Sequence, residues 1–566
     1  MSLKVVVIGG VAAGAKAAAR IARRDPEAEV TVLEKGEYIS YAACGFPFFI
    51  SDEVKEHKHL LSTPIGIIRD SAYFKKVKGV TVYTKTLAEG IDRETKLVKT
   101  VHTETGERKE FPYDKLVLST GGSPVVPSIE GINLNHIYNL WRVEDALAIK
   151  NDITRGNVKR AVVIGGGLIG MEMVEAFNRW GIEVTVVEML GWVLPKIIDR
   201  DFGLFIGRYL EDSGIRIHIL EKVLRFEGDA NGNVRKVVTD KNELETDIVL
   251  LAIGVRPNVE LARKAGIVLG ATGAVQVNEY LQTSDPDIYA GGDCVENTHR
   301  ISGKKVYTPM GSTANKHGRV IADHITGEAF PFSGVLGTGI CKVLDLNIAR
   351  TGLSEGESRS EGFSVETVIC PSPDRPHYYP GSKSIITKLV ADKKTGRLLG
   401  AQIIGPGDVA KRIDIVAAAL SFGATVEDVA MLDLAYAPPF SLAMDNIITA
   451  AHIMDNKIKG LAKAVSPLVV KEKLDRGDDF IFLDVRSAGE YEMVRIEQPN
   501  VLLLPLGKVR EEYKNLPNDK EIITFCGASL RGYEAQRILE VKGFKNVKFM
   551  DGGISAWPFE KFVRGT

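Results

Sequence analysis

Short runs of apolar residues recur along the chain, and the clearest ones are followed by a turn and then by a helical pattern. Residues 5–8 and 161–164 are continuous apolar runs that end at glycine-rich turns, and residues 30–33 and 184–187, each with one threonine, form the next strand-like run. Continuous runs of this length are typical of buried strands. A strand, a helix and a second strand in this order predict parallel sheets with crossover helices.

The pattern changes towards the C-terminus. Residues 331–455 alternate strand-like and helix-like pieces, with a hairpin signal at residues 392–397. After about residue 459 a strand and helix pattern restarts, and Ser466 followed by proline is typical of the beginning of a helix. The strands expected in this last part are residues 480–486 and 522–525.

The first glycine-rich turn is suited to binding a pyrophosphate. Gly9, Gly10 and Gly14 lie between a strand and an alanine-rich helix, with Val11 where GxGxxG has its middle glycine. In such a turn the backbone comes close to the phosphates, whose charge is met by N–H groups at the helix N-terminus. Glu34 ends the next strand 20 residues after Gly14, where a carboxylate accepts a hydrogen bond from a ribose hydroxyl. We therefore predict a dinucleotide site.

The second turn repeats this arrangement with complete spacing. Gly165, Gly167 and Gly170 precede a helix, and Glu188 ends the following strand 18 residues after the last glycine. An acidic residue there repels a 2′-phosphate, so NADH is expected rather than NADPH. A single turn of this kind is equally well explained as a tight connection, but two copies with two glutamates favour dinucleotide binding. Two such sites on one chain imply electron transfer between two cofactors.

The composition excludes several classes of protein. The 566 residues suffice for about three to four domains. Lysine and arginine number 72 against 73 acidic residues, so no net charge attracts nucleic acid or an anionic membrane. No apolar run approaches the roughly 18 residues of a membrane span, and we expect no signal peptide. The five scattered cysteines predict no disulfide framework, so we expect a cytoplasmic protein without nucleic-acid partner or membrane insertion.

Three further segments resemble conserved segments of the flavoprotein disulfide reductases that carry two dinucleotide domains. They are residues 116–124, 251–258 and 288–293. The resemblance covers roughly residues 1–455 and implies an FAD domain interrupted by an NAD domain, with FAD on the first glycine turn and NADH on the second. In these segments it assigns cofactor contacts to Thr120, Gly121, Gly254, Gly292 and Asp293, the last of them towards the ribityl or phosphate region of FAD.

Residues 40–48 resemble the active-site segment of the single-cysteine branch of that family, which includes coenzyme A disulfide reductases, NADH oxidases and NADH peroxidases. Cys44 is that cysteine, and Pro47 and Phe49 stand where a second one would be. A lone thiolate cannot store electrons as an internal disulfide, so it cycles through a mixed disulfide, a persulfide or a sulfenic acid. The resemblance makes Cys44 catalytic, and a small buried residue is the alternative. Burial is the expectation for Cys294, Cys341 and Cys370.

Two tyrosine-bearing segments, residues 376–381 and 435–440, resemble those of the coenzyme A disulfide reductases. They lie in a region that resembles the family's dimerisation domain, where the tyrosines reach across a homodimer to the partner's cysteine. The resemblance gives this catalytic role to Tyr378 and Tyr436, since a phenol donates a hydrogen bond or a proton to a departing thiolate. The alternative is a pair of buried aromatic residues with satisfied hydroxyls.

Coenzyme A is held by its phosphates in these relatives. Arg23, with Arg20 next, matches the arginine of the first helix that contacts coenzyme A. Lys75 and Lys76 lie near the place of a further family lysine. For the lysines, a solvated charged face is the alternative.

Residues 466–566 resemble a rhodanese domain, with residues 551–553 matching its C-terminal segment. Cys526 follows an expected strand, and a short loop connects it to Arg531 and a helix. N–H groups in such a loop lower a thiol pKa and stabilise a terminal sulfur anion. Four residues lie between Cys526 and Arg531, as in sulfurtransferases, whereas related phosphatases have five; Ser529 stands where many relatives have glycine. A persulfide carrier is favoured over a phosphatase or an inactive interaction domain.

The expected fold class is α/β, with two Rossmann-like three-layer dinucleotide-binding domains, an α+β dimerisation domain and a C-terminal α/β rhodanese domain. The boundaries follow from the positions of the motifs. They are 1–115 and 251–330 for the FAD domain, 116–250 for the NAD domain, 331–455 for the dimerisation domain, 456–465 for a linker and 466–566 for the rhodanese domain.

The whole arrangement resembles fusions of coenzyme A disulfide reductase with rhodanese, which include NADH-dependent persulfide and polysulfide reductases. The resemblance implies an enzyme in which NADH and FAD deliver electrons to sulfur on Cys44 and Cys526 carries sulfane sulfur. Coenzyme A persulfide, polysulfide or coenzyme A disulfide would be the substrate, and no metal is expected. Two alternatives stay open: an NADH oxidase or peroxidase acting through a sulfenic acid on Cys44, and a redox-sensing or scaffold flavoprotein.

Overall fold

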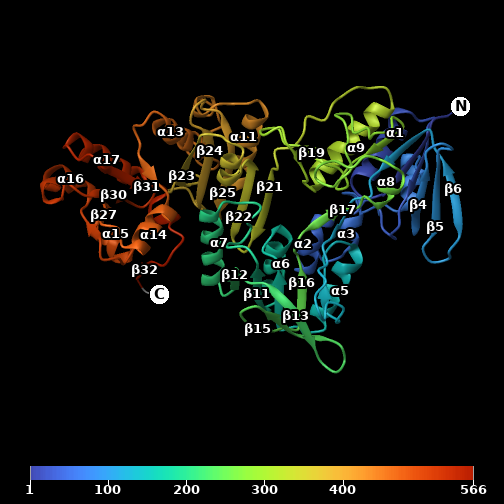
Figure 1. Cartoon of the computed structure of the whole chain (residues 1–566), viewed down its shortest axis with the longest axis horizontal. Helices are drawn as coiled ribbons and strands as arrows, with labels where there is room; N and C mark the ends of the chain where they lie inside the picture. The colour runs from blue at the N-terminus through green and yellow to red at the C-terminus, as the bar shows by residue number, and fades with distance from the viewer. Residues whose placement is uncertain (1, 565–566) are drawn as a thin grey trace. The chain divides into compact units, whose positions relative to one another are not determined.

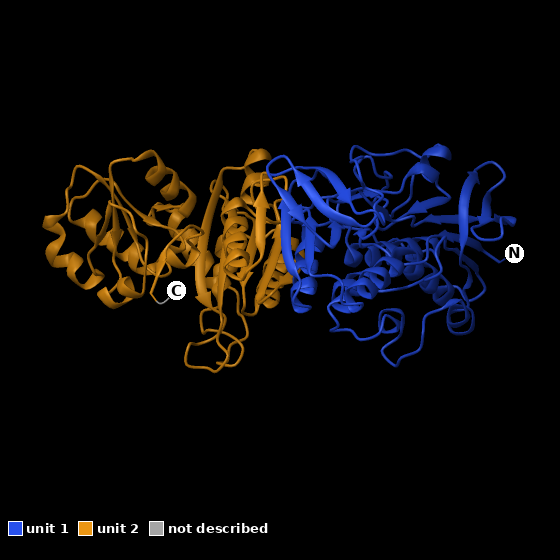
Figure 2. Ribbon diagram, turned by 90° about the horizontal axis from the view of Figure 1, so that it is seen from below, with its two compact units in different colours: residues 1–187, 221–335 blue, residues 188–220, 336–566 orange. Residues whose placement is uncertain are grey.

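The computed structural model describes residues 2–564. The chain forms two compact units, residues 1–187 with 221–335 and residues 188–220 with 336–566 (Figure 2). Parallel sheets dominate the first unit, whereas the second contains an antiparallel and a parallel sheet (Figure 1).

The first sheet of unit 1 is parallel, with strand order β18-β7-β1-β2-β3. The apolar run predicted at residues 5–8 forms most of its central strand, and none of these four side chains is more than 6% exposed. Neighbours on both sides and cover on both faces explain why this run contains no polar residue. The strands are β1 (Lys4–Ile8), β2 (Glu29–Leu33), β3 (Thr81–Tyr83), β7 (Lys115–Leu118) and β18 (Ile288–Ala290).

Helix α1 (Ala13–Arg24) follows the first glycine turn and packs against α9 (Gly311–Ile325). Its alanines bring the two helices close together. A Cβ on Gly318 would lie 2.3 Å from the carbonyl oxygen of Ala13, so only glycine allows this approach. The helix N-terminus is thereby held at the carboxyl end of β1.

A second βαβ arrangement follows the same plan. Strands β11, β10, β16 and β9 lie side by side and parallel, in this order. Residues 161–164 of β10 are buried, as the apolar pattern predicts. The elements are β9 (Ile137–Tyr138), β10 (Arg160–Ile164), α6 (Leu168–Arg179), β11 (Glu183–Glu188) and β16 (Ile248–Leu251).

Antiparallel pieces connect these sheets. β8 (Gly122–Pro124) and β17 (Val255–Pro257) pair with each other, so two segments that lie far apart in sequence are side by side. Two three-stranded antiparallel sheets complete the unit. They are β4 (Thr86–Asp92), β5 (Leu97–His102) and β6 (Arg108–Pro112), and β13 (Val223–Gly228), β14 (Val234–Thr239) and β15 (Glu243–Glu245).

Unit 2 contains an antiparallel sheet with strand order β21-β22-β25-β24-β23. β24 and β25 form the hairpin predicted at residues 392–397. Helices α11 and α13 pack on the sheet. The elements are β21 (Gly339–Val343), β22 (Leu346–Gly352), β23 (Val365–Pro373), β24 (Ser384–Asp392), β25 (Leu398–Gly405), α11 (Val409–Ser421) and α13 (Asn446–Ile458).

The C-terminal part of unit 2 has a parallel sheet with strand order β26-β31-β30-β27-β29. Ser466 caps α14 as predicted, because its Oγ accepts a hydrogen bond from the N–H of Val469 at 3.3 Å. The elements are β26 (Ala464–Val465), α14 (Pro467–Arg476), β27 (Phe480–Asp484), α15 (Ala488–Met493), β29 (Val501–Leu503), β30 (Glu521–Phe525), α17 (Leu530–Val541) and β31 (Val547–Met550).

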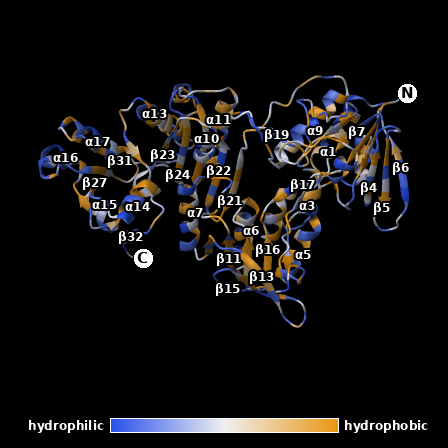
Figure 3. Ribbon diagram, viewed as in Figure 1, coloured by the Kyte–Doolittle hydropathy of each residue, from blue (hydrophilic) through white to orange (hydrophobic). Residues whose placement is uncertain are grey.

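These bounds bear on the expected domain borders. β7 includes residues on both sides of the 115/116 border, and all of it belongs to the first sheet. The expected linker at 456–465 contains the end of α13 and all of β26. Hydrophilic and hydrophobic residues alternate along the helices (Figure 3), and no helix within residues 2–564 is long and apolar enough to cross a membrane.

Candidate active sites

The first glycine turn depends on its glycines for the backbone path itself. A Cβ on Gly9 would lie 2.1 Å from the carbonyl oxygen of Ser119, and one on Gly14 would lie 1.9 Å from that of Gly9. Gly9 also has a φ of 99°, in the region that favours glycine. These two residues let β1, β7 and the N-terminus of α1 meet at one point.

The second turn repeats this with one informative difference. A Cβ on Gly165 would lie 2.5 Å from the carbonyl oxygen of Ala252, and one on Gly170 would lie 2.1 Å from that of Gly165. At Gly167, by contrast, no atom lies within 4 Å of the Cβ position. The fold requires Gly165 and Gly170, whereas Gly167 leaves room at the N-terminus of α6, where a pyrophosphate is bound in such turns.

A carboxylate ends the strand after each turn. Glu34 accepts hydrogen bonds from the N–H groups of Gly10 and Gly36, each at 2.8 Å. Glu188 accepts one from the N–H of Leu190 at 2.8 Å. Both glutamates are buried. A carboxylate has about four lone-pair positions, so Glu34 is oriented by two N–H groups and keeps capacity for a ribose hydroxyl. The N–H of Leu190 likewise orients Glu188.

The backbone next to the paired strands β8 and β17 is not covered by side chains at two glycines. Thr120 Oγ1 donates to the carbonyl oxygen of Asn258 at 2.7 Å, and Asn258 Nδ2 donates back to that of Thr120 at 2.9 Å. Gly121 and Gly254 have φ values of 67° and 123°, and neither has an atom within 4 Å of its Cβ position. This geometry fits a flat group lying against the backbone.

Asp293 follows β18 and the left-handed Gly292, whose φ is 82°. The N–H of Gly292 donates to His317 Nδ1 at 3.1 Å, and the hydroxyl of Tyr307 donates to the carbonyl oxygen of Asp293 at 2.9 Å. Burial raises the pKa of the Asp293 carboxyl to about 6. Such a carboxyl is suited to hydrogen bonding with a sugar hydroxyl.

Cys44 is exposed, in contrast to the other four cysteines, and none of the five forms a disulfide within residues 2–564. It lies in a 3-10 turn, Ala43–Gly45, just before the short helix α2 (Phe46–Ile50). Reduced hydration raises the pKa of the Cys44 thiol, and the carboxylates of Glu172 and Asp293 raise it further. Exposure rules out the alternative of a buried packing residue, and this environment keeps the thiol protonated until a base takes the proton.

Glu172 is a residue that the motifs did not indicate. It lies on α6, which packs against α2, and it is half-buried. Burial, with the nearby Glu175, raises the pKa of Glu172 to about 7. It is thus a carboxyl near Cys44 that can exchange a proton at neutral pH. The only signal in the sequence is its place two residues after the last glycine of the second turn.

Tyr378 and Tyr436 are 66% and 51% exposed, so the reading of two buried aromatic residues is wrong. They lie in separate loops of unit 2 that Arg412 of α11 connects. Arg412 is fully buried, and its Nη2 donates to the carbonyl oxygen of Asp374 at 2.7 Å and lies 3.1 Å from Asp445 Oδ2. The two tyrosine-bearing loops are therefore fixed to the same helix.

The four predicted coenzyme A contacts differ in availability. Arg20 Nε donates to the buried Asp323 at 2.6 Å, so its guanidinium holds α1 to α9. Lys75 donates to Thr81 Oγ1 at 2.9 Å. Arg23 and Lys76 are exposed, and neither has an ion-pair partner within the described part of the chain. Exposed cations of this kind are free to meet a phosphate.

The Cys526 loop connects β30 to α17 and is supported by the segment after β31. Cys526 is 2% exposed, and its carbonyl oxygen accepts a hydrogen bond from the N–H of Ile554 at 2.9 Å. Ser529 has a φ of 92°, which is strained for a residue other than glycine. Its Oγ accepts a hydrogen bond from the N–H of Gly552 at 2.7 Å. A glycine at this position would relieve the strain but would lose this hydrogen bond.

Arg531 lies beside Cys526 and pairs with a residue that the motifs did not indicate. Its two Nη atoms lie 2.8 and 2.6 Å from the two carboxylate oxygens of Glu490 on α15. Hydrogen bonding to Arg531 lowers the pKa of Glu490 to about 2. Glu490 also completes a capping box with Ser487, a local pattern that is visible in the sequence. The pair orients the guanidinium at the loop.

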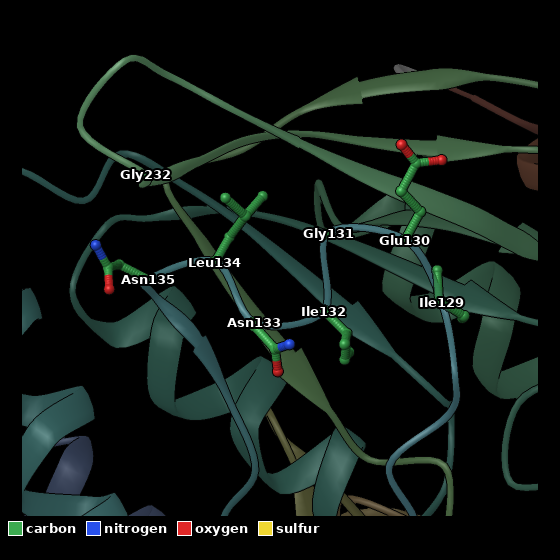
Figure 4. A pocket seen from close by; sticks show the side chains of 8 residues that line it. All are labelled: Ile129, Glu130, Gly131, Ile132, Asn133, Leu134, Asn135 and Gly232. Carbon is green, nitrogen blue, oxygen red and sulfur yellow. The ribbon is translucent and has the colours of Figure 1, made fainter.

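A cavity of about 560 Å³ lies elsewhere in unit 1, at the loop of residues 129–135 beside Gly232 (Figure 4). Its lining mixes the apolar Ile132 and Leu134 with polar side chains. None of the predicted site residues contributes to it.

Two glycine turns under parallel strands, a carboxylate after each and an exposed cysteine define a dinucleotide-dependent oxidoreductase; a separate cysteine loop adds a sulfurtransferase type of site. The chain belongs to the pyridine nucleotide-disulphide oxidoreductase family, which matches residues 3–315. The dimerisation domain of that family matches residues 338–447, and a rhodanese-like domain matches residues 466–559.

Several relatives are similar over most of the chain. The NAD(P)H coenzyme A polysulfide/persulfide reductase of Pyrococcus horikoshii is 40% identical over 455 residues, which is 80% of this chain and 99% of the relative. The NAD-dependent persulfide reductase of A. fulgidus is 43% identical with a TM-score of 0.93, covering 98% of this chain and all of the other. Reduced CoADR-RHD of Bacillus anthracis is 35% identical with a TM-score of 0.92, covering 98% of each chain.

Proposed function

We propose that the protein is an FAD-dependent, NADH-driven reductase of sulfane sulfur or disulfide bonds in coenzyme A persulfide, polysulfide or coenzyme A disulfide. The observation that carries this proposal is the pair of cysteines. Cys44 is exposed in the dinucleotide-binding unit, and Cys526 lies in a loop of sulfurtransferase length beside Arg531. The relatives whose names include persulfide or disulfide reduction support the substrate class.

The residues around the two glycine turns fit the two cofactors that the family implies. We assign FAD to the first glycine turn, with Glu34, Thr120 and Asp293, and NADH to the second, with Glu188. When bound, these groups supply two electrons per turnover. The open space at Gly121, Gly167 and Gly254 is the feature that would accept them.

Cys44 performs the chemistry on sulfur. After Glu172 accepts its proton, the thiolate attacks the terminal sulfur of coenzyme A persulfide, forming an S–S bond to Cys44 while the original S–S bond breaks and coenzyme A leaves as a thiolate. Two electrons that originate in NADH then break the new S–S bond, which releases hydrosulfide and restores the Cys44 thiolate. The exposure of Cys44 supports access for a substrate of this size.

The exposed tyrosines suggest how the leaving thiolate is protonated. We infer a homodimer through the region that matches the dimerisation domain, in which Tyr378 and Tyr436 donate to the departing thiolate at the partner's Cys44.

Arg23, Lys75 and Lys76 would contact the phosphates of coenzyme A, with Arg20 holding the helix. Cys526 would carry sulfane sulfur as a persulfide oriented by Arg531. We infer action in the cytoplasm, because the five scattered cysteines form no disulfide framework.

Anaerobic NADH oxidation tests the proposal. Flavin-loaded enzyme is expected to oxidise one NADH for each sulfide released from coenzyme A persulfide or polysulfide. Peroxide and oxygen should give much smaller specificity constants. A larger constant for peroxide would establish the oxidase or peroxidase alternative instead, and no turnover with any sulfur substrate would refute the reductase.

The glycines provide a matched test of the cofactor assignment. Gly14→Ala forces a Cβ to within 1.9 Å of a backbone oxygen, so we expect failure to retain FAD. Gly167→Ala meets no protein atom within 4 Å, so its flavin absorbance should stay normal while the KM for NADH rises by about tenfold. An unchanged KM would show that NADH does not bind over this turn.

A further inference from the structure

Lys457 is a buried cation near the end of α13. Its Nζ lies 2.9 Å from Asp551 Oδ2 and 3.3 Å from Glu366 Oε1, and it also donates to the carbonyl oxygen of Thr367. Burial disfavours an ammonium group, but the two carboxylates outweigh this effect and raise the pKa of Lys457. Both partners of this charged group lie in unit 2, with Glu366 on β23 of the antiparallel sheet and Asp551 just after β31 of the C-terminal sheet.

Asp551 begins the segment that supports the Cys526 loop. The next residue, Gly552, donates its N–H to Ser529 Oγ inside that loop at 2.7 Å. On its other side, a Cβ on Gly552 would lie 2.7 Å from Cγ2 of Ile369 on β23. The segment is thus packed between β23 and the Cys526 loop, with the ion pair at its first residue.

We infer that Lys457 is a positioning residue for Cys526. It fixes Asp551 against Glu366 of β23. Gly552 and Ser529 pass this constraint to the Cys526 loop, which is thereby held in the shape that sulfur transfer requires. The inference rests on the proposed role of Cys526 as a sulfur carrier. A buried ion pair costs desolvation, and well-packed apolar residues would hold two sheets together equally well. What the pair adds is one fixed direction for Asp551.

Substitution in the full-length, flavin-loaded enzyme tests this role. Lys457→Met is expected to lower kcat/KM for sulfur transfer from a persulfide donor to cyanide by about tenfold, because a small displacement of reacting groups is costly. NADH-driven reduction at Cys44 should stay within about twofold. Lys457→Arg should restore most of the transfer. Lys459→Met removes an exposed charge just after the same helix and serves as the control, with no effect on either reaction.

The reactivity of Cys526 separates positioning from general stability. The pH midpoint of its alkylation, followed on its peptide by mass spectrometry, is expected to rise in Lys457→Met because a displaced loop moves the sulfur away from the N-terminus of α17. Arg531, the charged group next to Cys526, is unchanged in this variant. The other titratable groups near the ion pair of Lys457 and Asp551 are Glu366 and the buried Cys370, both on β23.

Asp551→Asn removes the charge that pairs with Lys457 but keeps the size of the side chain. If Lys457→Met fails to fold, the rate of sulfur transfer and the alkylation midpoint of Cys526 are measured in this variant instead. The inference is overturned if a cooperatively folded variant keeps both the transfer rate and the alkylation midpoint of the wild type. A wild-type enzyme that transfers no sulfur, combined with a shifted midpoint in the variants, would instead refute the proposed function of Cys526 and leave the positioning role of Lys457 supported.

Discussion

The two cysteines proposed to be reactive have opposite surroundings. Cys44 is exposed, and reduced hydration of its thiol, followed by the carboxylates of Glu172 and Asp293, raises its pKa. Cys526 is 2% exposed, lies beside Arg531 and belongs to a loop fixed by a second segment of chain. The first site suits a thiol that must admit a large substrate and lose its proton only during reaction. The second is fixed in position and suits the acceptance and transfer of a single sulfur atom.

Replacing Cys44 gives the sharpest contrast. Cys44→Ser is expected to lower NADH-driven persulfide reduction by at least about 1000-fold, because the nucleophile itself is lost. Flavin absorbance and sulfur transfer to cyanide should not change. Reduction that persists in this variant would mean that sulfur is reduced without a cysteine intermediate.

Replacing Cys526 tests the comparison from the other side. Cys526→Ser should lower sulfur transfer to cyanide by about 100-fold or more, whereas NADH-driven reduction of coenzyme A persulfide should stay within about threefold. Both effects are measured as steady-state rates of sulfur transfer and of NADH oxidation on the same preparation. If both reactions fall together, sulfur must pass through Cys526 before it is reduced, and the two sites are not independent.

Ser529 tests whether the rigidity of the Cys526 loop matters. Ser529→Ala keeps the strained φ and leaves the buried N–H of Gly552 without its acceptor, which should lower the free energy of unfolding by about 1 to 2 kcal/mol. Ser529→Gly loses the same hydrogen bond but relieves about 1 kcal/mol of strain, so its loss should be smaller. Protection of Cys526 from alkylation during urea titration measures both. Equal losses would remove the argument from strain.

Glu490 is expected to have the smallest effect, confined to acid. Its pKa is lowered to about 2 from about 4.3 in an unfolded chain, so the pair with Arg531 stabilises the fold above pH 4.3 and this contribution disappears as the pH falls towards 2. Glu490→Gln should lower the unfolding temperature slightly at pH 6 and not at pH 2, because the pair is partly exposed. Glu492→Gln, an exposed neighbour on α15, is the control and should show no such pH dependence.

Much of the fold follows from local sequence patterns. Continuous apolar runs predict β1, β2, β10 and β11, since each is covered on both faces, and the glycine turns are visible because the backbone itself needs them. The beginning of α14 at Ser466 and the hairpin at residues 392–397 likewise depend on neighbouring residues only.

What the sequence does not reveal depends on partners that are distant along the chain. Lys457 and Asp551 are 94 residues apart, and Arg531 and Glu490 are 41 apart. Charge and burial at these positions acquire meaning only when the fold brings the partners together. Arg20 illustrates the reverse case: a motif position suggests a phosphate contact, whereas the folded chain uses the side chain to bind Asp323.

The buried ion pairs of Lys457 connect the rhodanese-like domain to the rest of the chain. The Pyrococcus horikoshii relative is matched over 99% of its length by 455 residues, so sulfur-reducing chains exist without room for the C-terminal sheet. A chain of this sequence cut after residue 460 would leave Lys457 facing Glu366 without Asp551, and Ile369 without its cover. The rhodanese-like domain is therefore continuous with the antiparallel sheet through buried groups, and its removal from this sequence would leave a buried charge and an apolar side chain newly exposed.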